Sequence, residues 1–404
     1  MAHWIVRFDV PVQRLLVLVT VSSPEVWQSV DSAATLKLQE NLDEAKRFVF
    51  QDESFDLQMD VKGSEVLWPL SSVLWELRLL GLWVPPPGRR LRHRLVLAFI
   101  MISHVANFLG AFASITMDTP SNLPQLSFIA YNCLIDAGLA CKMFSFSLDG
   151  QRLTELLRLL AASRQRFPDK AGHRARYQAT AVKLHRFMQV TYRINNAYWF
   201  LAPIVRNIMA AISKNVSTSE RVIPLPIWLP FDLRSSPVYE IVYSLEMASG
   251  LAVSETTVLV DGTLIALILQ VVAELAVLND HLADGATATL KHSASDVTII
   301  QGEVQDSNVQ VLQKDMDIVE SLKMLMGSSL YAYQVALFCL LGQRIINQSE
   351  RLMRSAFGGD WPDGDVRCWR LLYMLCLSTS RALSLKICGI YTLSRMTLLQ
   401  EKQL

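Results

Sequence analysis

Long apolar segments, separated by a short turn or by charged stretches, dominate the pattern of this chain. Leu95–Met117 and Leu126–Phe146 are each long enough to cross the hydrocarbon core of a bilayer as a helix, which takes about 20 residues. The turn between them, residues 118–122, contains no Lys or Arg. We therefore predict a hairpin of two spans whose tip lies on the outer side.

Three further apolar segments predict spans near residues 196–212, 239–278 and 326–341. The first of these is interrupted by Pro203 and Arg206. The second carries five acidic side chains and has no charge-free stretch as long as about 18 residues. A long helix that leaves the membrane and continues into the cytosol fits this second segment better than two separate spans.

Together these segments predict an all-α membrane protein that folds as a multi-span helical bundle. We assign residues 65–404 to one transmembrane domain, within which residues 342–404 form a cytosolic anchor and the start of a last helix. Residues 1–64 are interpreted as an N-terminal extension, poorly ordered or artefactual, because most of this stretch is charged and polar without clean periodicity.

Composition and net charge limit the classes of function that the chain can have. Hydrophobic residues make up 51% of the chain and the mean hydropathy is +0.27, above the range of typical soluble domains. The net charge of +1 provides no basic field for a nucleic acid. Residues 149–193 contain ten Lys and Arg, and four Arg lie between residues 89 and 94, so we place both stretches, and the N-terminus, in the cytosol.

No enzymatic or metal-binding motif is present. The chain lacks a P-loop, a GxGxxG turn, an HExxH helix and a GxSxG elbow. Its seven histidines show no metal-ligand spacing, and its six cysteines lie in or beside apolar segments. We therefore expect no enzyme activity, no cofactor and no metal site.

A series of short motifs resembles the insect odorant receptors, which are odorant-gated cation channels. The motifs are Trp228-Leu229-Pro230-Phe231-Asp232, Gly342-Gln343, Gln348-Ser349, Ala356-Phe357, Trp361, Ser378–Leu383 and Leu393-Ser394. The resemblance implies a subunit that binds volatile ligands and joins the olfactory co-receptor in a hetero-oligomeric channel in the plasma membrane of olfactory sensory neurons. It assigns pore or anchor roles to Trp361, Leu393 and Ser394.

A neutral volatile ligand needs apolar surface with one or two polar groups to orient it. We expect it among the outer halves of the second, third, fourth and last predicted spans, and the candidate contacts are Phe128, Tyr131, Ile204, Met209, Tyr243, Met247 and Tyr331. The sequon at Asn215 falls in the predicted outer loop and is expected to accept a glycan.

The chain departs from the family in two places. Residues 318–324 run directly into the span at 326–341, so a fifth span is missing, and few residues follow Leu393-Ser394 for a last helix. Basic residues after that span also favour the cytosol, which leaves both its ends on one side unless residues 239–278 form a hairpin. We therefore expect no odorant-dependent current from this chain. The alternatives are a non-conducting truncated receptor product and a multi-span transporter.

Overall fold

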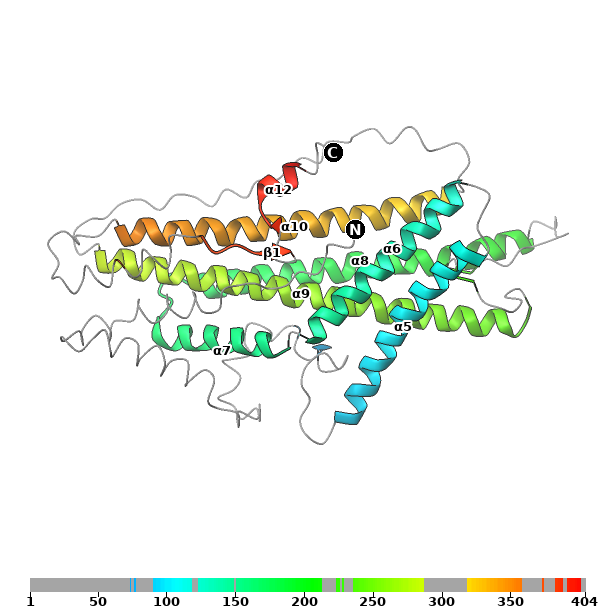
Figure 1. Cartoon of the computed structure of the whole chain (residues 1–404), viewed down its shortest axis with the longest axis horizontal. Coiled ribbons are helices and arrows are strands. Elements are labelled where there is room, and N and C mark those ends of the chain that lie inside the picture. Colours follow the sequence, from blue (N-terminus) through cyan, green and yellow to red (C-terminus); the bar gives the residue numbers. More distant parts are fainter. Residues whose placement is uncertain are drawn as a thin grey trace.

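The structure is a computed structural model, and it consists mainly of long helices in one elongated bundle (Figure 1). It describes residues 90–117, 123–148, 150–212, 235–286, 318–357, 382–387 and 391–400, with short pieces at 73, 76–77, 223–225, 227–228 and 373. The proposed N-terminal extension, residues 1–64, lies outside the described residues.

Helices α5 (Arg90–Met117) and α6 (Leu123–Leu148) form the predicted hairpin. The outward face of α5 is apolar, with side chains such as Leu95, Ile102 and Leu109 more than half exposed. Its inward face is tied to the bundle by Asn107, whose amide donates a hydrogen bond of 3.0 Å to the Ser249 hydroxyl. An exposed apolar face of this length suits lipid better than water.

Helix α7 (Gly150–Arg166) turns into α8 (His173–Ile212) through residues 167–172. Gly172 has a φ of 71°, a left-handed conformation that glycine adopts without a steric cost. The Asp169 carboxylate accepts hydrogen bonds from the backbone N–H groups of His173 (3.0 Å) and Arg174 (2.7 Å), which caps α8. Partial burial acts to raise the pKa of Asp169, but these hydrogen bonds and the nearby positive charges lower it below its ordinary value.

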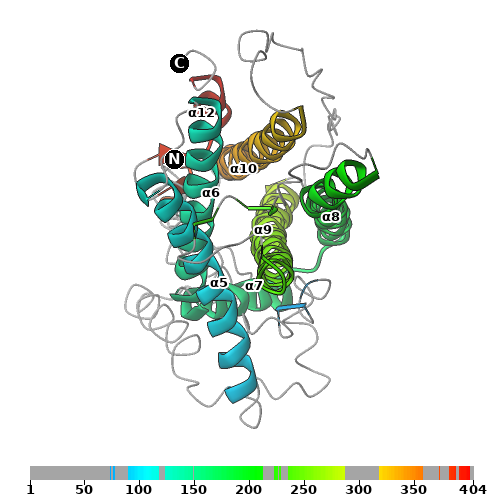
Figure 2. The ribbon, with the colours of Figure 1, turned by 90° about the vertical axis from the view of Figure 1, so that its right-hand side faces the viewer.

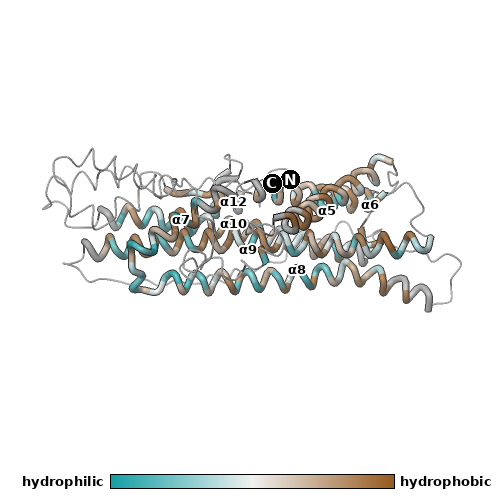
Figure 3. The backbone as a smooth tube through the Cα atoms, turned by 90° about the horizontal axis from the view of Figure 1, so that it is seen from below, coloured by the Kyte–Doolittle hydropathy of each residue, from teal (hydrophilic) through white to brown (hydrophobic). Residues whose placement is uncertain are grey.

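Helix α8 is hydrophilic over its first half and apolar towards Ile212, as Figure 3 shows. The sequence predicted a span only near residues 196–212, interrupted by Pro203. The helix instead continues through Pro203 as one unit of 40 residues. Its first half therefore extends the span into the predicted cytosolic region.

Helix α9 (Val238–Ala286) is the centre of the bundle and has 49 residues. The end-on view in Figure 2 shows it between α8 on one side and α5 and α6 on the other, with α10 and α7 flanking it. Every residue in its most apolar 18-residue window is buried inside the chain. A helix that is hydrophobic on all sides buries all sides, and α9 does so by packing against every other long helix. Because α9 is continuous, the hairpin alternative for residues 239–278 is wrong.

Helix α10 (Ile318–Phe357) runs parallel to α9. Gln334 donates to the Asp261 carboxylate at 2.7 Å and Ser355 donates to Asn279 at 2.6 Å, so the sequence offset between partners stays near constant, at 73 and 76. Both helices thus begin at the same end of the bundle (Figure 1). The sequence between the two helices, residues 287–317, lies outside the described residues. It carries seven Asp, Glu and Lys and does not predict a span.

A short C-terminal segment lies along α10. Strand β1 (Lys386–Ile387) pairs antiparallel with β2 (Tyr391–Thr392), and α12 (Arg395–Gln400) follows. Ser349 on α10 accepts a hydrogen bond of 3.0 Å from the Leu383 backbone N–H. Gly342 on α10 lies so close to Leu393 that a Cβ atom there would come within 2.9 Å of the Leu393 Cβ. This small β-hairpin is the one departure from all-α structure among the described residues.

Candidate ligand-binding site

Aromatic side chains from α6 and α8 stack in the half of the bundle where α9 begins (Figure 1). The rings of Phe128 and Trp199 lie 5.9 Å apart with an interplanar angle of 14°. Phe128 is buried. This stacked pair forms an apolar wall between α6 and α8.

Two oppositely charged side chains are buried next to this wall. The Lys323 ammonium of α10 lies 4.9 Å from the centre of the Trp199 ring, within the range of a cation–π contact. Glu246 of α9 lies close enough for Lys323 to act on its carboxylate electrostatically. Each residue is 4% exposed. Burial of charges at membrane depth is costly, so such residues mark functional or tightly structural positions.

Part of the proline-containing loop between α8 and α9 covers this end of the bundle. The Leu225 backbone N–H donates a hydrogen bond of 3.2 Å to one oxygen of Glu246, and Trp228 N–H donates to the Gly110 carbonyl of α5 at 3.2 Å. Gly110 lets the loop approach, because a Cβ there would come within 2.9 Å of Ile227. The loop thus lies over the site between α5 and α9.

Helices α8 and α9 approach closely beside Glu246, at positions one turn before and one turn after it along α9. The Tyr243 hydroxyl donates a hydrogen bond to the Phe200 carbonyl, and the Phe200 ring fills the space in front of Gly250. Tyr243 is buried and Phe200 is 7% exposed. The site is therefore lined by aromatic rings on two sides.

One to two helical turns deeper, three tyrosines gather between α6, α8 and α10. Tyr131, Tyr192 and Tyr331 lie near enough to interact electrostatically, and the Tyr131 hydroxyl lies against Gly327. Below them Lys142 pairs with Asp261, which also accepts the hydrogen bond from Gln334. Asp261 is fully buried. Aromatic walls with a charged floor are a suitable environment for a small, mostly apolar ligand with one polar group.

The seven predicted ligand contacts fall into three groups. Phe128, Tyr131, Tyr243 and Tyr331 are buried or half-buried in the layers just described. Ile204 and Met247 are 37% and 40% exposed on the outside of the bundle. The Met209 side chain lies outside the described residues. A contact with ligand stays a prediction for all of them.

Trp199, Glu246 and Lys323 were not predicted as ligand contacts. The available signal was a charge inside an apolar helix, since Glu246 lies within the predicted fourth span. Their convergence depends on how the three helices α8, α9 and α10 are aligned with one another, and hydropathy does not show that alignment.

Two of the three predicted pore and anchor residues, Leu393 and Ser394, lie in the described C-terminal segment. Leu393 is buried against α10, and the Ser394 hydroxyl accepts a hydrogen bond of 3.3 Å from Thr397 N–H at the start of α12. Trp361 and the sequon Asn215 lie outside the described residues. Their roles stay predictions.

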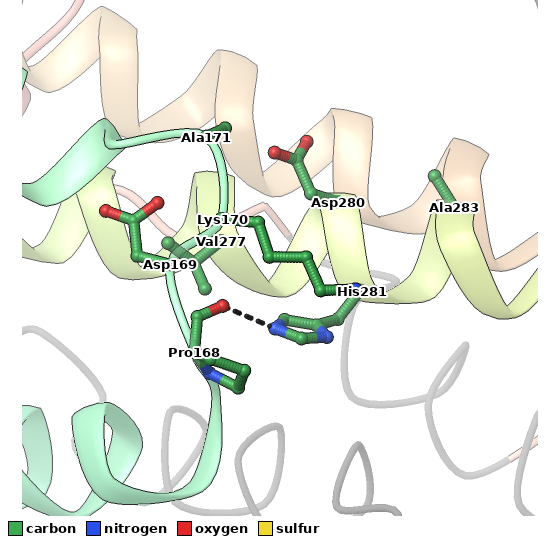
Figure 4. A pocket seen from close by; sticks show the side chains of 8 residues that line it. All are labelled: Pro168, Asp169, Lys170, Ala171, Val277, Asp280, His281 and Ala283. Carbon is green, nitrogen blue, oxygen red and sulfur yellow. Dashed lines mark hydrogen bonds between the residues drawn. The ribbon is translucent and has the colours of Figure 1, made fainter.

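A separate cavity lies at the other end of the bundle, where the α7–α8 turn meets the end of α9 (Figure 4). The His281 ring N–H donates to the Pro168 carbonyl at 2.9 Å and closes one side of it. Half of its lining residues are polar or charged, among them Asp169, Lys170 and Asp280. Its lining includes no Phe, Tyr or Trp, the large apolar rings that favour a volatile ligand. Within the described residues no group of His, Cys, Asp and Glu is arranged to hold a metal ion.

Comparison with known proteins decides the family. The family model described as the 7tm odorant receptor matches residues 122–314 and 308–400 of this chain. The chain belongs to the odorant receptor family. The two matched segments meet in residues 308–314, within the stretch that joins α9 to α10. The resemblance to the insect odorant receptors, which the short motifs indicated, is confirmed.

Relatives of this odorant receptor agree in sequence and in fold. It is 23% identical to the putative odorant receptor 85d of Drosophila melanogaster over 350 residues, which cover 77% of this chain and 79% of the relative. The solved structures of the olfactory receptor OR5 from Machilis hrabei, with eugenol and without it, match with TM-scores of 0.58 and 0.56 at 12% identity. Both matches cover 83% of this chain and 94% of the solved chain.

Membership of the odorant receptor family and the shared fold settle three expectations. The predicted multi-span helical bundle is confirmed, and the protein is a multi-pass membrane receptor of a ligand-gated channel family, not an enzyme. Among the described residues four helices are long and apolar enough to cross a membrane, namely Leu95–Met117, Gln125–Phe146, Val238–Ala283 and Ser321–Ser355. The transporter alternative has no support from these relatives.

Proposed function

We propose that this odorant receptor binds a volatile ligand among α6, α8, α9 and α10 and acts as the ligand-binding subunit of a cation channel formed with the olfactory co-receptor. The Phe128–Trp199 stack against the buried Glu246 and Lys323 carries the proposal, because it combines apolar walls with polar groups that can orient a ligand. The similar fold of a receptor solved with eugenol adds support.

The same proposal places the protein in the plasma membrane of olfactory sensory neurons with its N-terminus in the cytosol. The basic residues in α7 and in the first half of α8 support this orientation, since positive loops stay on the cytoplasmic side. The outer halves of the helices, with the site between them, then face the exterior, where odorants arrive.

Binding and gating are tested separately. Purified chain in detergent is heated with a panel of volatile alcohols, ethers and phenols, and a ligand that binds the native state raises the unfolding temperature. We expect at least one ligand to do so in the wild type, and Trp199→Ala to weaken its binding about tenfold through loss of the stacked wall. Phe144→Ala, on the exposed face of α6, is the matched control. An unchanged ligand affinity in Trp199→Ala would contradict the proposed binding site.

Gating is measured as cation current in cells that express the chain with the co-receptor. The non-conducting alternative keeps its motivation, because α9 and α10 run parallel and the sequence between them predicts no return span. The control is a variant with an apolar span inserted between residues 287 and 317. Odorant-dependent current from the unmodified chain would exclude the non-conducting alternative, whereas current from the inserted variant alone would support it.

A further inference from the structure

The first half of helix α8 exposes positive charges that no acidic residue of the helix offsets. None of its 40 residues is Asp or Glu. Arg176, Lys183 and Arg186 are exposed and form no ion pair with the described residues. Lys183 and Arg186 are three positions apart, so their side chains are neighbours on the helix surface and repel each other. A negatively charged partner from outside the chain would remove this repulsion.

The outward face of α8 becomes apolar directly after these charges (Figure 3). Six apolar side chains beyond Arg186 are more than half exposed, namely Phe187, Val190, Ile194, Leu201, Val205 and Ile208. They follow one another at intervals of three, four or seven residues, which keeps them on the same face as Lys183. This apolar face begins at Phe187, whereas the hydropathy of the sequence placed the start of the span near residue 196.

The length of the apolar face matches that of a bilayer interior. From Phe187 to Ile208 the helix rises about 32 Å, at 1.5 Å per residue, and the hydrocarbon core of a bilayer is about 30 Å thick. The sequence of this stretch contains two charged residues, Arg193 and Arg206. Arg193 donates to Glu255 of α9 at 2.8 Å, so this pair adds no net charge to the face, and Arg206 lies two residues from its end. The edge of the bilayer therefore falls between Arg186 and Phe187.

The partner of this face has to combine a negative charge with long apolar chains. A soluble anion would meet the basic side chains and leave the apolar ones in water. A phospholipid with an anionic head group offers both parts in the right order, because its head group lies at the edge of the bilayer and its acyl chains extend into the interior. Lys and Arg side chains at such an edge reach the phosphate level while their stems cover apolar surface.

We infer that the outward face of α8 binds an anionic phospholipid, whose head group contacts Lys183 and Arg186 while its acyl chains lie along Phe187 and Val190. In the orientation proposed above, this lipid belongs to the cytosolic leaflet, which is the leaflet rich in anionic lipids. Lipid binding on this face is separate from odorant binding and shares only that orientation with it.

The first experiment measures the preference for a negative head group. Purified chain in detergent is titrated with phosphatidylserine, or with phosphatidylcholine of the same acyl chains, and native mass spectrometry counts the bound lipid in ammonium acetate of about 0.15 M. We expect the wild type to bind phosphatidylserine about tenfold more tightly, because each basic residue near the head group adds to the attraction. In the double variant Lys183→Gln/Arg186→Gln the preference should fall to about twofold or less.

The matched control removes two exposed positive charges elsewhere. Arg344→Gln/Arg351→Gln changes two exposed residues of α10 that form no ion pair with the described residues. The Phe187 ring lies 5.5 Å from that of Tyr333 on α10, which marks the level of the bilayer edge on this helix. Arg344 and Arg351 lie about 16 and 27 Å beyond Tyr333, more than a Debye length, so the control should keep the wild-type preference.

A conservative variant separates loss of charge from loss of structure. Lys183→Arg/Arg186→Lys keeps both positive charges and should keep the preference for phosphatidylserine. Inorganic phosphate at millimolar concentration is added as a competitor and should not displace the lipid, since phosphate has no acyl chains to contact Phe187 and Val190. Displacement by phosphate would show a simple anion site and overturn the assignment to a lipid.

The second experiment tests the apolar part of the face in lipid nanodiscs. In a background without native cysteines, Ala179→Cys and Val190→Cys are treated with a water-soluble maleimide. Both positions are exposed on the surface of the chain. We expect Ala179→Cys to react and Val190→Cys to be protected by acyl chains, and both to react equally after denaturation.

Each outcome decides for or against the lipid site. Equal affinity of the wild type for the two lipids, or a preference that survives in Lys183→Gln/Arg186→Gln, would overturn it. Labelling of Val190→Cys in nanodiscs as fast as Ala179→Cys would place this face in water and overturn it as well. None of these results bears on the proposed odorant binding, which is measured with volatile ligands and the Trp199→Ala variant.

Discussion

Two kinds of residue decide how the helices pack against one another: buried charged side chains, and glycines that have no side chain. Buried charges occur at three levels along α9, with Glu246 in its first part, Asp261 in the middle and Glu274 in its last part. Glycines mark places where helices or loops touch, as Gly250 does against Phe200 and Gly342 against Leu393. In each case the residue type is required by its neighbours and not by the helix that contains it.

Gly342 provides the sharpest test at this scale. We expect Gly342→Ala to destabilise the protein by about 1–3 kcal/mol, because its Cβ would meet the backbone carbonyl of Leu393, which cannot turn away as a side chain would. The measurement is the unfolding temperature of purified chain, together with proteolysis of the C-terminal segment.

Gly138→Ala is the control for this change, since it is also a helical glycine and nothing lies within 4 Å of its added Cβ. Because alanine has a higher helix propensity than glycine, we expect this variant to have an unchanged or slightly raised unfolding temperature. Equal effects of the two substitutions would show that β1, β2 and the following residues do not pack on α10 as described.

At the scale of elements, α7, α8 and α9 are joined by one buried carboxylate. Glu274 accepts hydrogen bonds from Arg174 on α8 at 2.8 and 2.7 Å, and from Ser163 on α7 at 2.8 Å. Arg164 on α7 also reaches it and donates to Gln270 at 2.6 Å. The two guanidinium groups are held beside each other by this single negative charge, so the inner ends of three helices depend on it.

We expect Glu274→Gln to cost about 3–5 kcal/mol, because it leaves two largely buried Arg without a counter-charge. The expected signs are a lower unfolding temperature and faster proteolysis in the turn between α7 and α8. Asp280→Asn is the control on the same helix. Its carboxylate pairs with His173 but is 48% exposed, so its loss should cost about 0–1 kcal/mol. Comparable losses in both variants would mean that Glu274 does not join the three helices.

The sequence predicted some elements well because the membrane itself selects their composition. The apolar runs of α5 and α6 end within a few residues of the predicted limits, since lipid contact imposes apolar side chains along the whole span. The full length of α8 was missed because its first half is rich in polar residues, which gave no membrane signal. The position of Lys323 over Trp199 could not be predicted, since it depends on the offset between α8 and α10.

At the scale of the whole molecule, the direction of each helix decides what the receptor can be. Helix α8 lies antiparallel to α9, as the contacts Arg193–Glu255, Gln178–Gln270 and Arg174–Glu274 show by moving in opposite directions along the two helices. Helix α10 lies parallel to α9. In the orientation proposed above, with the first half of α8 in the cytosol, α9 enters the membrane from the outside, and so does α10. The same proposal then places the start of α10 on the outer side together with the candidate site.

This orientation predicts which ends of α10 react with a membrane-impermeant maleimide on intact cells. In a background without native cysteines, Ser321→Cys should be labelled from outside, whereas Ser355→Cys should be labelled only after permeabilisation. The physical reason is the pairing of Asp261 with Gln334 and of Asn279 with Ser355, which brings Ser321 level with the outer end of α9. Labelling of Ser321→Cys from the cytosolic side alone would make α10 antiparallel to α9. Those two hydrogen bonds could not then both form, and Lys323 would lie far from Trp199 and Glu246, which would remove the arrangement on which the proposed ligand site rests.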